Sequence, residues 1–199
     1  MIFYLIGKTA SGKNSIASEL IKRVDGLQLY IPYTTRPRRS HEVDGKDYHF
    51  ISETELDEYE SAGKIIEKRV YQTVHGPWTY ATIEDDILDE GISAPVSHNG
   101  NVLMIGTLES FRSVRNKYGA DALKGLYIEC EDGLRLQRAL DREKEEVEPK
   151  YKELCRRFLA DEEDYSPENV KKSSIDKVFR NEDFFSCVGE IEEYIRAAV

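Results

Sequence analysis

The most constraining feature of this chain is a glycine-rich turn that lies between an apolar run of strand length and a helical pattern. Residues 2–6 read IFYLI, and the sequence GKTASGKNS follows at once. From residue 15 the apolar side chains recur at helical spacing, and Gly26 marks the end of that helix. Strand, turn and helix in this order open a βαβ unit, so the start of the chain favours an α/β fold.

The turn has the spacing of a phosphate-binding loop, GxxxxGK, with Gly7, Gly12 and Lys13 at its fixed positions. The two glycines let several backbone N–H groups point into one cavity, the following helix adds its positive end, and the lysine adds a full charge. The alternative is a glycine-rich turn that binds nothing. The strand before the turn and the helix after it favour the phosphate loop, so we expect it to bind the phosphates of a nucleotide.

One position of this loop departs from the usual pattern. A serine or threonine whose hydroxyl contacts Mg²⁺ ordinarily follows the lysine, whereas this chain has Asn14 and then Ser15. An amide oxygen is an acceptable hard ligand for Mg²⁺, either directly or through a water molecule. Asn14 is therefore the candidate metal ligand.

Strands and helices alternate along the remainder of the 199 residues. Strands are predicted at 27–33, 101–106, 125–130 and 176–179, and residues 64–82 alternate like strands with a Gly-Pro turn in their middle. Helices are predicted at 52–63, 83–91, 108–119, 134–147, 150–165 and 188–199. Ser52 and Glu55 form the S-x-x-E capping box of the first of these helices. The alternation predicts one α/β domain with a mainly parallel sheet flanked by helices.

The charge balance argues against a general nucleic-acid binder. The chain has 28 Lys+Arg against 38 Asp+Glu, a net charge of −10, whereas affinity for a phosphate backbone needs clustered cations. No apolar run approaches the roughly 20 residues that span a bilayer, and the apolar start lacks the basic lead of a signal peptide. Three widely spaced cysteines without a CxxC pair indicate reduced thiols and no zinc site. We expect a cytoplasmic protein with no nucleic-acid or membrane partner.

A second motif points to a family. Residues 34–50, TTRPRRSHEVDGKDYHF, are basic in an otherwise acidic chain and place three arginines within four positions. Together with the phosphate loop, TTRPRR followed by EVDGKDYHF resembles the nucleoside-monophosphate segment of the guanylate kinases, most strongly over residues 5–82. The resemblance implies a P-loop kinase that transfers the γ-phosphoryl group of MgATP to GMP or dGMP, with Mg²⁺ entering with ATP.

The resemblance also implies how the single domain, residues 1–199, is divided. Its core would comprise residues 1–31, 83–132 and 174–199. The monophosphate-binding region would be residues 32–82, and a helical lid would cover about 133–165. Closure of that lid over the monophosphate would exclude water from the transfer.

For the acceptor nucleotide, the resemblance points to six residues. Guanidinium forks and a phenol suit phosphate oxygens, and a carboxylate suits the adjacent N1–H and N2–H donors of guanine. The monophosphate would be held by Arg36, Arg39 and Tyr48, and the base by Glu67, with a further phosphate and base contact from Tyr80 and Thr82. From the residues alone, an exposed basic loop and a surface glutamate are the alternatives.

For ATP, the resemblance assigns a catalytic set and a binding set. The catalytic cations would be Lys13, Arg138, Arg142 and Arg157, with Arg156 as the alternative to the last. The ATP-binding residues would be Gly7, Ala10, Ser11, Gly12, Lys13, Asn14, Ser15 and Asn181. Without the family, arginines on charged helices are more typical of solvated ion pairs.

Besides Asn14, further positions depart from the family pattern, among them Ala81 in place of a glycine. Pro32 stands where the family has a serine, and Met104 and Gly106 stand where it has acids on a strand end. The acids nearby in sequence that could order the metal are Glu84, Asp85, Asp86 and Glu109. The departures keep two other hypotheses open: a kinase for a different monophosphate, or a catalytically weakened domain that binds peptides. Oligomeric state is not predicted.

Overall fold

The computed structural model describes residues 1–39, 42–73, 76–84, 100–146 and 148–199. In chain order its elements are β1 (Ile2–Ile6), α1 (Lys13–Arg23), β2 (Leu27–Leu29), β3 (Tyr33–Thr34), β4 (His49–Phe50), α2 (Glu53–Ser61), β5 (Ile65–Thr73), β6 (Gly76–Ile83), β7 (Asn101–Gly106), α3 (Leu108–Tyr118), β8 (Leu123–Glu129), α4 (Asp132–Lys144), α5 (Tyr151–Asp164), α6 (Pro167–Lys172), β9 (Lys177–Arg180) and α7 (Phe184–Ala198). Within these ranges, no helix is both long and apolar enough to cross a membrane.

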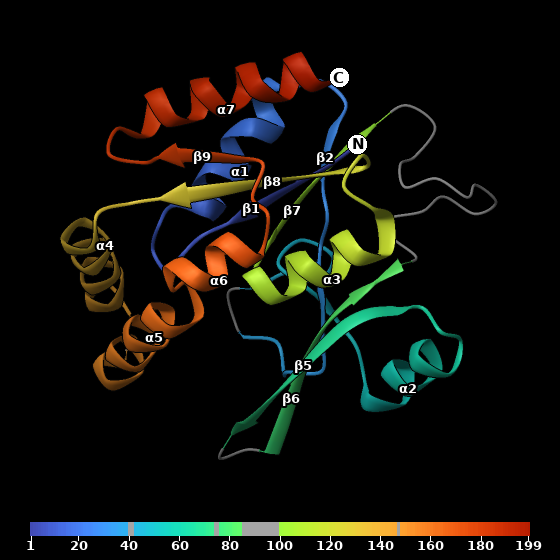
Figure 1. Ribbon diagram of the computed structural model, residues 1–199. Helices are drawn as coiled ribbons and strands as arrows, with labels where there is room; N and C mark the ends of the chain where they lie inside the picture. Colours follow the sequence, from blue (N-terminus) through green and yellow to red (C-terminus); the bar gives the residue numbers. More distant parts are fainter. Residues whose placement is uncertain (40–41, 74–75, 85–99, 147) are drawn as a thin grey trace.

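The central sheet confirms the predicted α/β fold. Its five strands lie in the order β2-β7-β1-β8-β9, and every neighbouring pair is parallel. Helices α1 and α7 cover one face and α3 and α6 the other (Figure 1). Successive side chains of β1 enter opposite cores: Phe3 packs with α1 and α7, and Tyr4 packs with α3. The buried strand therefore supports both layers and ends at the glycine-rich turn.

A second, smaller sheet lies below the first in Figure 1 and has the order β4-β3-β6-β5. Its long hairpin, β5 and β6, is antiparallel, and α2 packs on this sheet through the buried Leu56. The helix begins at the fully formed capping box of Ser52 and Glu55. The strand predicted at 27–33 is wrong as a single element. It is divided into β2 in the large sheet and β3 in the small one, with Pro32, which has no N–H to donate, between them.

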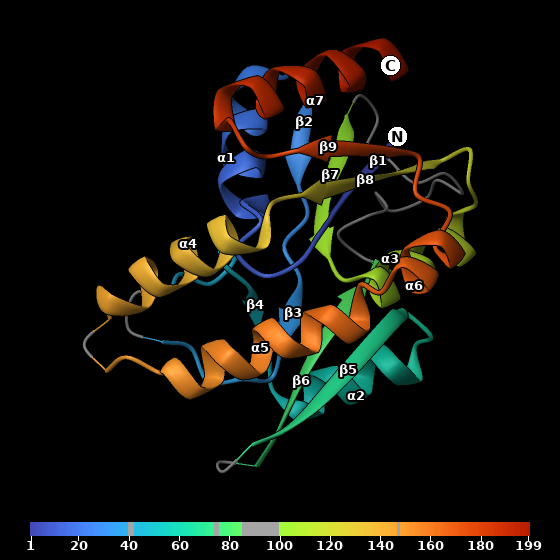
Figure 2. The ribbon, with the colours of Figure 1, turned by 60° about the vertical axis from the view of Figure 1, so that its left-hand side comes forward.

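The two charged helices α4 and α5 follow the carboxyl end of β8 as a pair (Figure 2). Two short elements, β4 and α6, have no counterpart among the predicted ones, because two and six residues are too few to show a period. The helix predicted at 83–91 lies largely outside the described residues, as do Asp85 and Asp86.

Candidate active site

The glycine-rich turn joins β1 to α1, and close contacts explain why it needs both glycines. Gly12 caps α1 in the left-handed region, with φ 96°, and a Cβ on it would run into the Nδ2 atom of Asn181. A Cβ on Gly7 would lie 2.6 Å from the carbonyl oxygen of Ile128. Side chains at these two positions would force the loop away from β8 and from Asn181, the residue that follows β9, so the close approach requires glycine.

The ammonium group of Lys13 is folded back over the loop. It donates hydrogen bonds to the carbonyl oxygens of Gly7 at 2.6 Å and Lys8 at 2.9 Å. Burial lowers the pKa of Lys13 to about 8; the carboxylate of Asp161 opposes this shift, and the guanidinium groups of Arg135 and Arg142 add to it. Two of the predicted catalytic cations, Lys13 and Arg142, therefore lie within electrostatic reach of each other.

Asn181, which follows β9, also contacts the loop. Its Nδ2 donates to the carbonyl oxygen of Ser11 at 2.8 Å, and the residue is 1% exposed. Its buried Oδ1 has no hydrogen-bond partner among the residues that the structure describes. Asn181 thus holds the loop in place, and its contact with ATP stays a prediction. Of the other predicted loop contacts, Asn14 and Ser15 lie in the first turn of α1, and Ala10 adopts φ 59°.

A carboxylate from α5 meets the first half of the loop, which the sequence did not reveal. Asp161 accepts hydrogen bonds from the backbone N–H and the hydroxyl of Thr9 at 2.7 and 3.3 Å. The same carboxylate pairs with Arg135 at 3.2 Å, and this arginine, 1% exposed, also donates to the carbonyl oxygen of Thr9. On the surface beside it, Lys8 pairs with Glu162 at 2.6 Å. The loop is therefore fastened to α4 and α5.

The predicted acceptor-phosphate residues partly gather around Arg36. This buried guanidinium donates through Nε to the hydroxyl of Tyr80 at 3.1 Å and lies 5.5 Å from the ring centre of Tyr48. Both of its terminal nitrogens face the carboxylate of Glu42, at 2.7 and 3.0 Å. The exposed Arg39 joins the cluster through its backbone N–H, which also donates to Glu42. Glu42 is thus a functional candidate that sequence reasoning missed.

The predicted base-reading residues face each other across the hairpin. Glu67 of β5 pairs in register with Thr82 of β6, and the threonine hydroxyl donates to Oε1 of the carboxylate at 2.9 Å. The other oxygen, Oε2, accepts from Nε of Arg69 at 3.2 Å. Two polar side chains, Thr82 and Arg69, therefore fix the orientation of the carboxylate, and the second of them was not predicted.

The two strand positions at which the family has acids are tightly packed in this protein. Met104 is 1% exposed and belongs to the core, and a Cβ on Gly106 would run into the hydroxyl of Tyr4. That hydroxyl donates to Oγ of Ser110 at 2.8 Å. The position of an acid at the end of β7 is thus filled by a tyrosine and a serine.

Two of the acids proposed as substitutes, Glu84 and Glu109, lie among the described residues. Glu84 is paired with Lys117 at 3.1 Å, and Glu109 is an exposed residue in the first turn of α3. Neither arrangement singles out a metal-ordering acid.

The predicted lid arginines lie on α4 and α5. Arg138 donates to the sulfur of Cys130 at 3.4 Å. Arg156 forms two bonds to Glu153, at 2.7 and 2.8 Å, whereas Arg157 reaches the same carboxylate through Nε alone, at 2.8 Å. The hydrogen bond from Arg156, helped by that from Arg157, lowers the pKa of Glu153 to about 2. Both α5 arginines are therefore held by one carboxylate.

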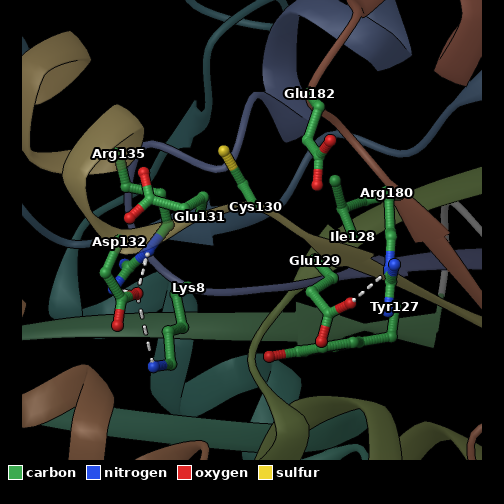
Figure 3. A pocket seen from close by; sticks show the side chains of 10 residues that line it. All are labelled: Lys8, Tyr127, Ile128, Glu129, Cys130, Glu131, Asp132, Arg135, Arg180 and Glu182. Atoms are coloured by element: carbon green, nitrogen blue, oxygen red, sulfur yellow. Dashed lines mark hydrogen bonds and ion pairs between the residues drawn. The ribbon is translucent and has the colours of Figure 1, made fainter.

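A cavity of about 440 Å³ opens where β8 and β9 end, beside the loop (Figure 3). Its lining comprises Lys8, residues 127–132, Arg135, Arg180 and Glu182. Ion pairs join Lys8 and Arg135 to Asp132 and Arg180 to Glu129. Ligands of parallel α/β sheets bind at the carboxyl ends of strands, and this cavity has that location.

Comparison with known proteins decides the family. A family model described as guanylate kinase matches residues 2–198. The chain belongs to the guanylate kinase family. A Thermotoga maritima protein named guanylate kinase is 32% identical over 117 residues, which are 59% of this chain and 52% of that protein. One from Wolbachia pipientis is 26% identical over 196 residues, 98% of this chain and 89% of that protein.

A solved member of the guanylate kinase family has the same fold. The crystal structure of guanylate kinase from Anaplasma phagocytophilum superposes with a TM-score of 0.64 at 22% identity, covering 99% of this chain and 85% of that one. The first curated relatives are matched over part of their length, 52% for the Thermotoga maritima protein and 60% for one from Salinibacter ruber. The guanylate kinase resemblance and the α/β fold are confirmed.

Proposed function

We propose that this protein transfers the γ-phosphoryl group of MgATP to GMP or dGMP, giving ADP and the nucleoside diphosphate. The acceptor phosphate already has a nucleophilic oxygen, so positioning and electrostatics suffice. Lys13 and the loop amides would hold the phosphates of ATP. Arg138, Arg142 and Arg157 would neutralise charge on the transferring group, with closure of α4 and α5 over the nucleotides.

The acceptor would bind between the small sheet and the end of β7. Arg36, Arg39, Tyr48 and Tyr80 are proposed to hold its phosphate, and Glu67 and Thr82 to read its base. The observation that supports this most is the pairing of Glu67 with Thr82, since an oriented, largely buried carboxylate offers two acceptor oxygens to the N1–H and N2–H of guanine. Adenine has an acceptor at N1 and would leave this carboxylate unpaired or repelled.

Members of this family use Mg²⁺ with ATP, and the residues present allow it with fewer protein ligands than usual. Asn14 sits in the first turn of α1, next to Lys13, and its amide oxygen is a suitable hard ligand. Because Met104 and Gly106 replace the strand acids, phosphate oxygens and water would supply the other ligands. We further propose a cytoplasmic protein whose substrates are small nucleotides rather than nucleic acid.

A panel assay tests the proposal. ADP formation from MgATP is measured with GMP, dGMP, AMP, CMP, UMP and dTMP, and the Lys13→Ala variant serves as the inactive control. We expect turnover with GMP or dGMP and its loss in the variant. Turnover with another monophosphate alone would overturn the guanine assignment. No turnover with any acceptor, in protein shown to be folded, would overturn the kinase and favour a peptide-binding domain.

A further inference from the structure

We propose that Arg69 is a second base-reading residue of the acceptor site, donating hydrogen bonds to the carbonyl oxygen at position 6 of the purine. The inference rests on the proposed function, because it concerns the same acceptor. It adds a residue that neither the phosphate loop nor the TTRPRR segment suggests.

The geometry of β5 places Arg69 beside Glu67. The two residues are separated by one position on a strand, so their side chains leave the same face of the sheet. The Nε of Arg69 donates to Oε2 of Glu67 at 3.2 Å, while Thr82 occupies Oε1. A carboxylate and a guanidinium thus lie side by side, and each limits the other to a narrow range of orientations.

The guanidinium also bridges the two sheets. Its Nη1 donates to the hydroxyl of Thr107, the residue that follows β7, at 3.4 Å. These two bonds use two of the five N–H groups of the guanidinium. The other three make no hydrogen bond to the residues that the structure describes. The side chain of Arg69 keeps 24% exposure, against 7% for that of Glu67. Donors of Arg69 are therefore available to a ligand that approaches Glu67.

The chemistry of guanine matches this pair. Along one edge the base presents the N2–H and N1–H donors and then the O6 acceptor. Glu67 accepts from the two donors, and an adjacent guanidinium supplies the donor that O6 requires. At position 6 adenine carries an amino group, whose hydrogens would face the N–H groups of Arg69. The pair would therefore discriminate at position 6 as well as at positions 1 and 2.

The departures elsewhere in the site explain why such a residue is needed. Pro32 has no side-chain donor, Met104 is buried, and Gly106 is closed off by Tyr4. The family's serine and strand acids are absent here, and Arg69 is a cation that pairs directly with the carboxylate of Glu67.

Base analogues test the role of Arg69. We compare kcat/KM for GMP, for 6-thio-GMP, whose sulfur is a weak acceptor at position 6, and for IMP, which lacks the 2-amino group. In the unsubstituted protein GMP should be preferred to both. Arg69→Met, which removes the donors at similar length, should lower kcat/KM for GMP by about 10- to 100-fold, the effect of losing a hydrogen bond from a charged group.

The ratios of kcat/KM between these nucleotides show whether Arg69 contacts the base. In Arg69→Met the preference for GMP over 6-thio-GMP should fall to about threefold or less, while the preference for GMP over IMP, which depends on Glu67, should persist. Lys68→Met is the matched control, because Lys68 points to the other face of β5 and pairs with the exposed Glu60. It should leave all ratios unchanged.

Three results would overturn the proposal. Equal losses for GMP and 6-thio-GMP would mean that Arg69 only orients Glu67. A gain in kcat/KM for GMP would mean that the arginine obstructs the base. A preference at position 6 that survives in Arg69→Met would assign it to another residue. Absence of GMP turnover in the unsubstituted protein would overturn the proposed function. In that case the role of Arg69 is still tested by calorimetry, from the ratios of the Kd values for GMP, 6-thio-GMP and IMP.

Discussion

Asp161 of α5 accepts a hydrogen bond from the backbone N–H of Thr9 in the phosphate loop, with 2.7 Å between the oxygen and the nitrogen. Two residues that are 152 positions apart in the chain are thereby joined, which fastens α5 to the loop that follows β1. The pairing of the same carboxylate with the buried Arg135 makes this contact a matter of stability as well as position.

Asp161→Asn should lower the free energy of unfolding by about 2 kcal/mol, because the buried guanidinium of Arg135 loses a charged partner. Asp132 still pairs with Arg135, which limits the loss. The matched control is Glu162→Gln, whose side chain is 45% exposed and should cost well under about 1 kcal/mol. Urea denaturation measures both, and equal effects would contradict the assignment.

The lowered pKa of Lys13 predicts proton-linked ATP binding. Its pKa falls from 10.5 in the unfolded chain to about 8 in the folded protein. Between these two pH values the unfolded chain binds more protons than the folded protein, so the free energy of unfolding increases as the pH rises through this range. Bound phosphates favour the ammonium form and raise its pKa again. At pH 9, calorimetry of ATP binding in buffers of different ionisation enthalpy should show uptake approaching one proton.

A matched variant isolates the proton taken up by Lys13. The arginine of Lys13→Arg stays charged throughout this pH range, so this variant should bind ATP without proton uptake. Its affinity should be lower, because a guanidinium group does not have the shape of the ammonium group. Uptake of the same size in this variant would assign the proton to another group.

Gly106→Ala should be destabilising by about 1–3 kcal/mol, since its Cβ would overlap the hydroxyl of Tyr4. Removing that hydroxyl in Tyr4→Phe should relieve part of the overlap. The double variant should therefore be more stable than the sum of the two single effects indicates, which thermal unfolding of the four proteins measures as a coupling energy. Simple additivity would show that the two positions do not compete for space.

Arg157→Ala should reduce kcat on the order of 100-fold or more, whereas Arg156→Ala should reduce it less than about threefold. The distinction follows from Glu153, which engages Arg156 through two nitrogens and Arg157 through Nε alone. Arg157 uses only Nε for its bond to Glu153, which leaves its terminal nitrogens outside that pair, and we expect them to contact the transferring phosphate. Steady-state kinetics with GMP decide between them, and the reverse order of effects would exchange their roles.

The parts of this molecule that could be predicted from sequence are those whose physics is local. The phosphate loop follows from the spacing of Gly7, Gly12 and Lys13, and α2 follows from its capping box. The pair of Glu67 and Thr82 was inferred from the family resemblance, and the register of β5 and β6 places them opposite each other. Their roles in binding stay predictions.

The parts that could not be predicted depend on contacts between distant segments. The bond from Thr9 to Asp161 spans 152 residues, and that from Asn181 to Ser11 spans 170. Nothing in one sequence indicates which arginine of a charged helix is buried, as Arg135 is. The same holds for the hydroxyl of Tyr4, which lies beside Gly106 although the two residues belong to different strands, β1 and β7.

The tyrosine hydroxyl that occupies the space beside Gly106 also limits the order in which this sequence can change. A side chain at position 106 would meet both the hydroxyl of Tyr4 and Oγ of Ser110, so an acid introduced there before these two residues change would be overpacked. Position 4 in turn is tied to Ser110 through its hydrogen bond. An acid at this strand end therefore needs coordinated changes at three positions, so a single mutation at position 106 is opposed by the packing of its neighbours.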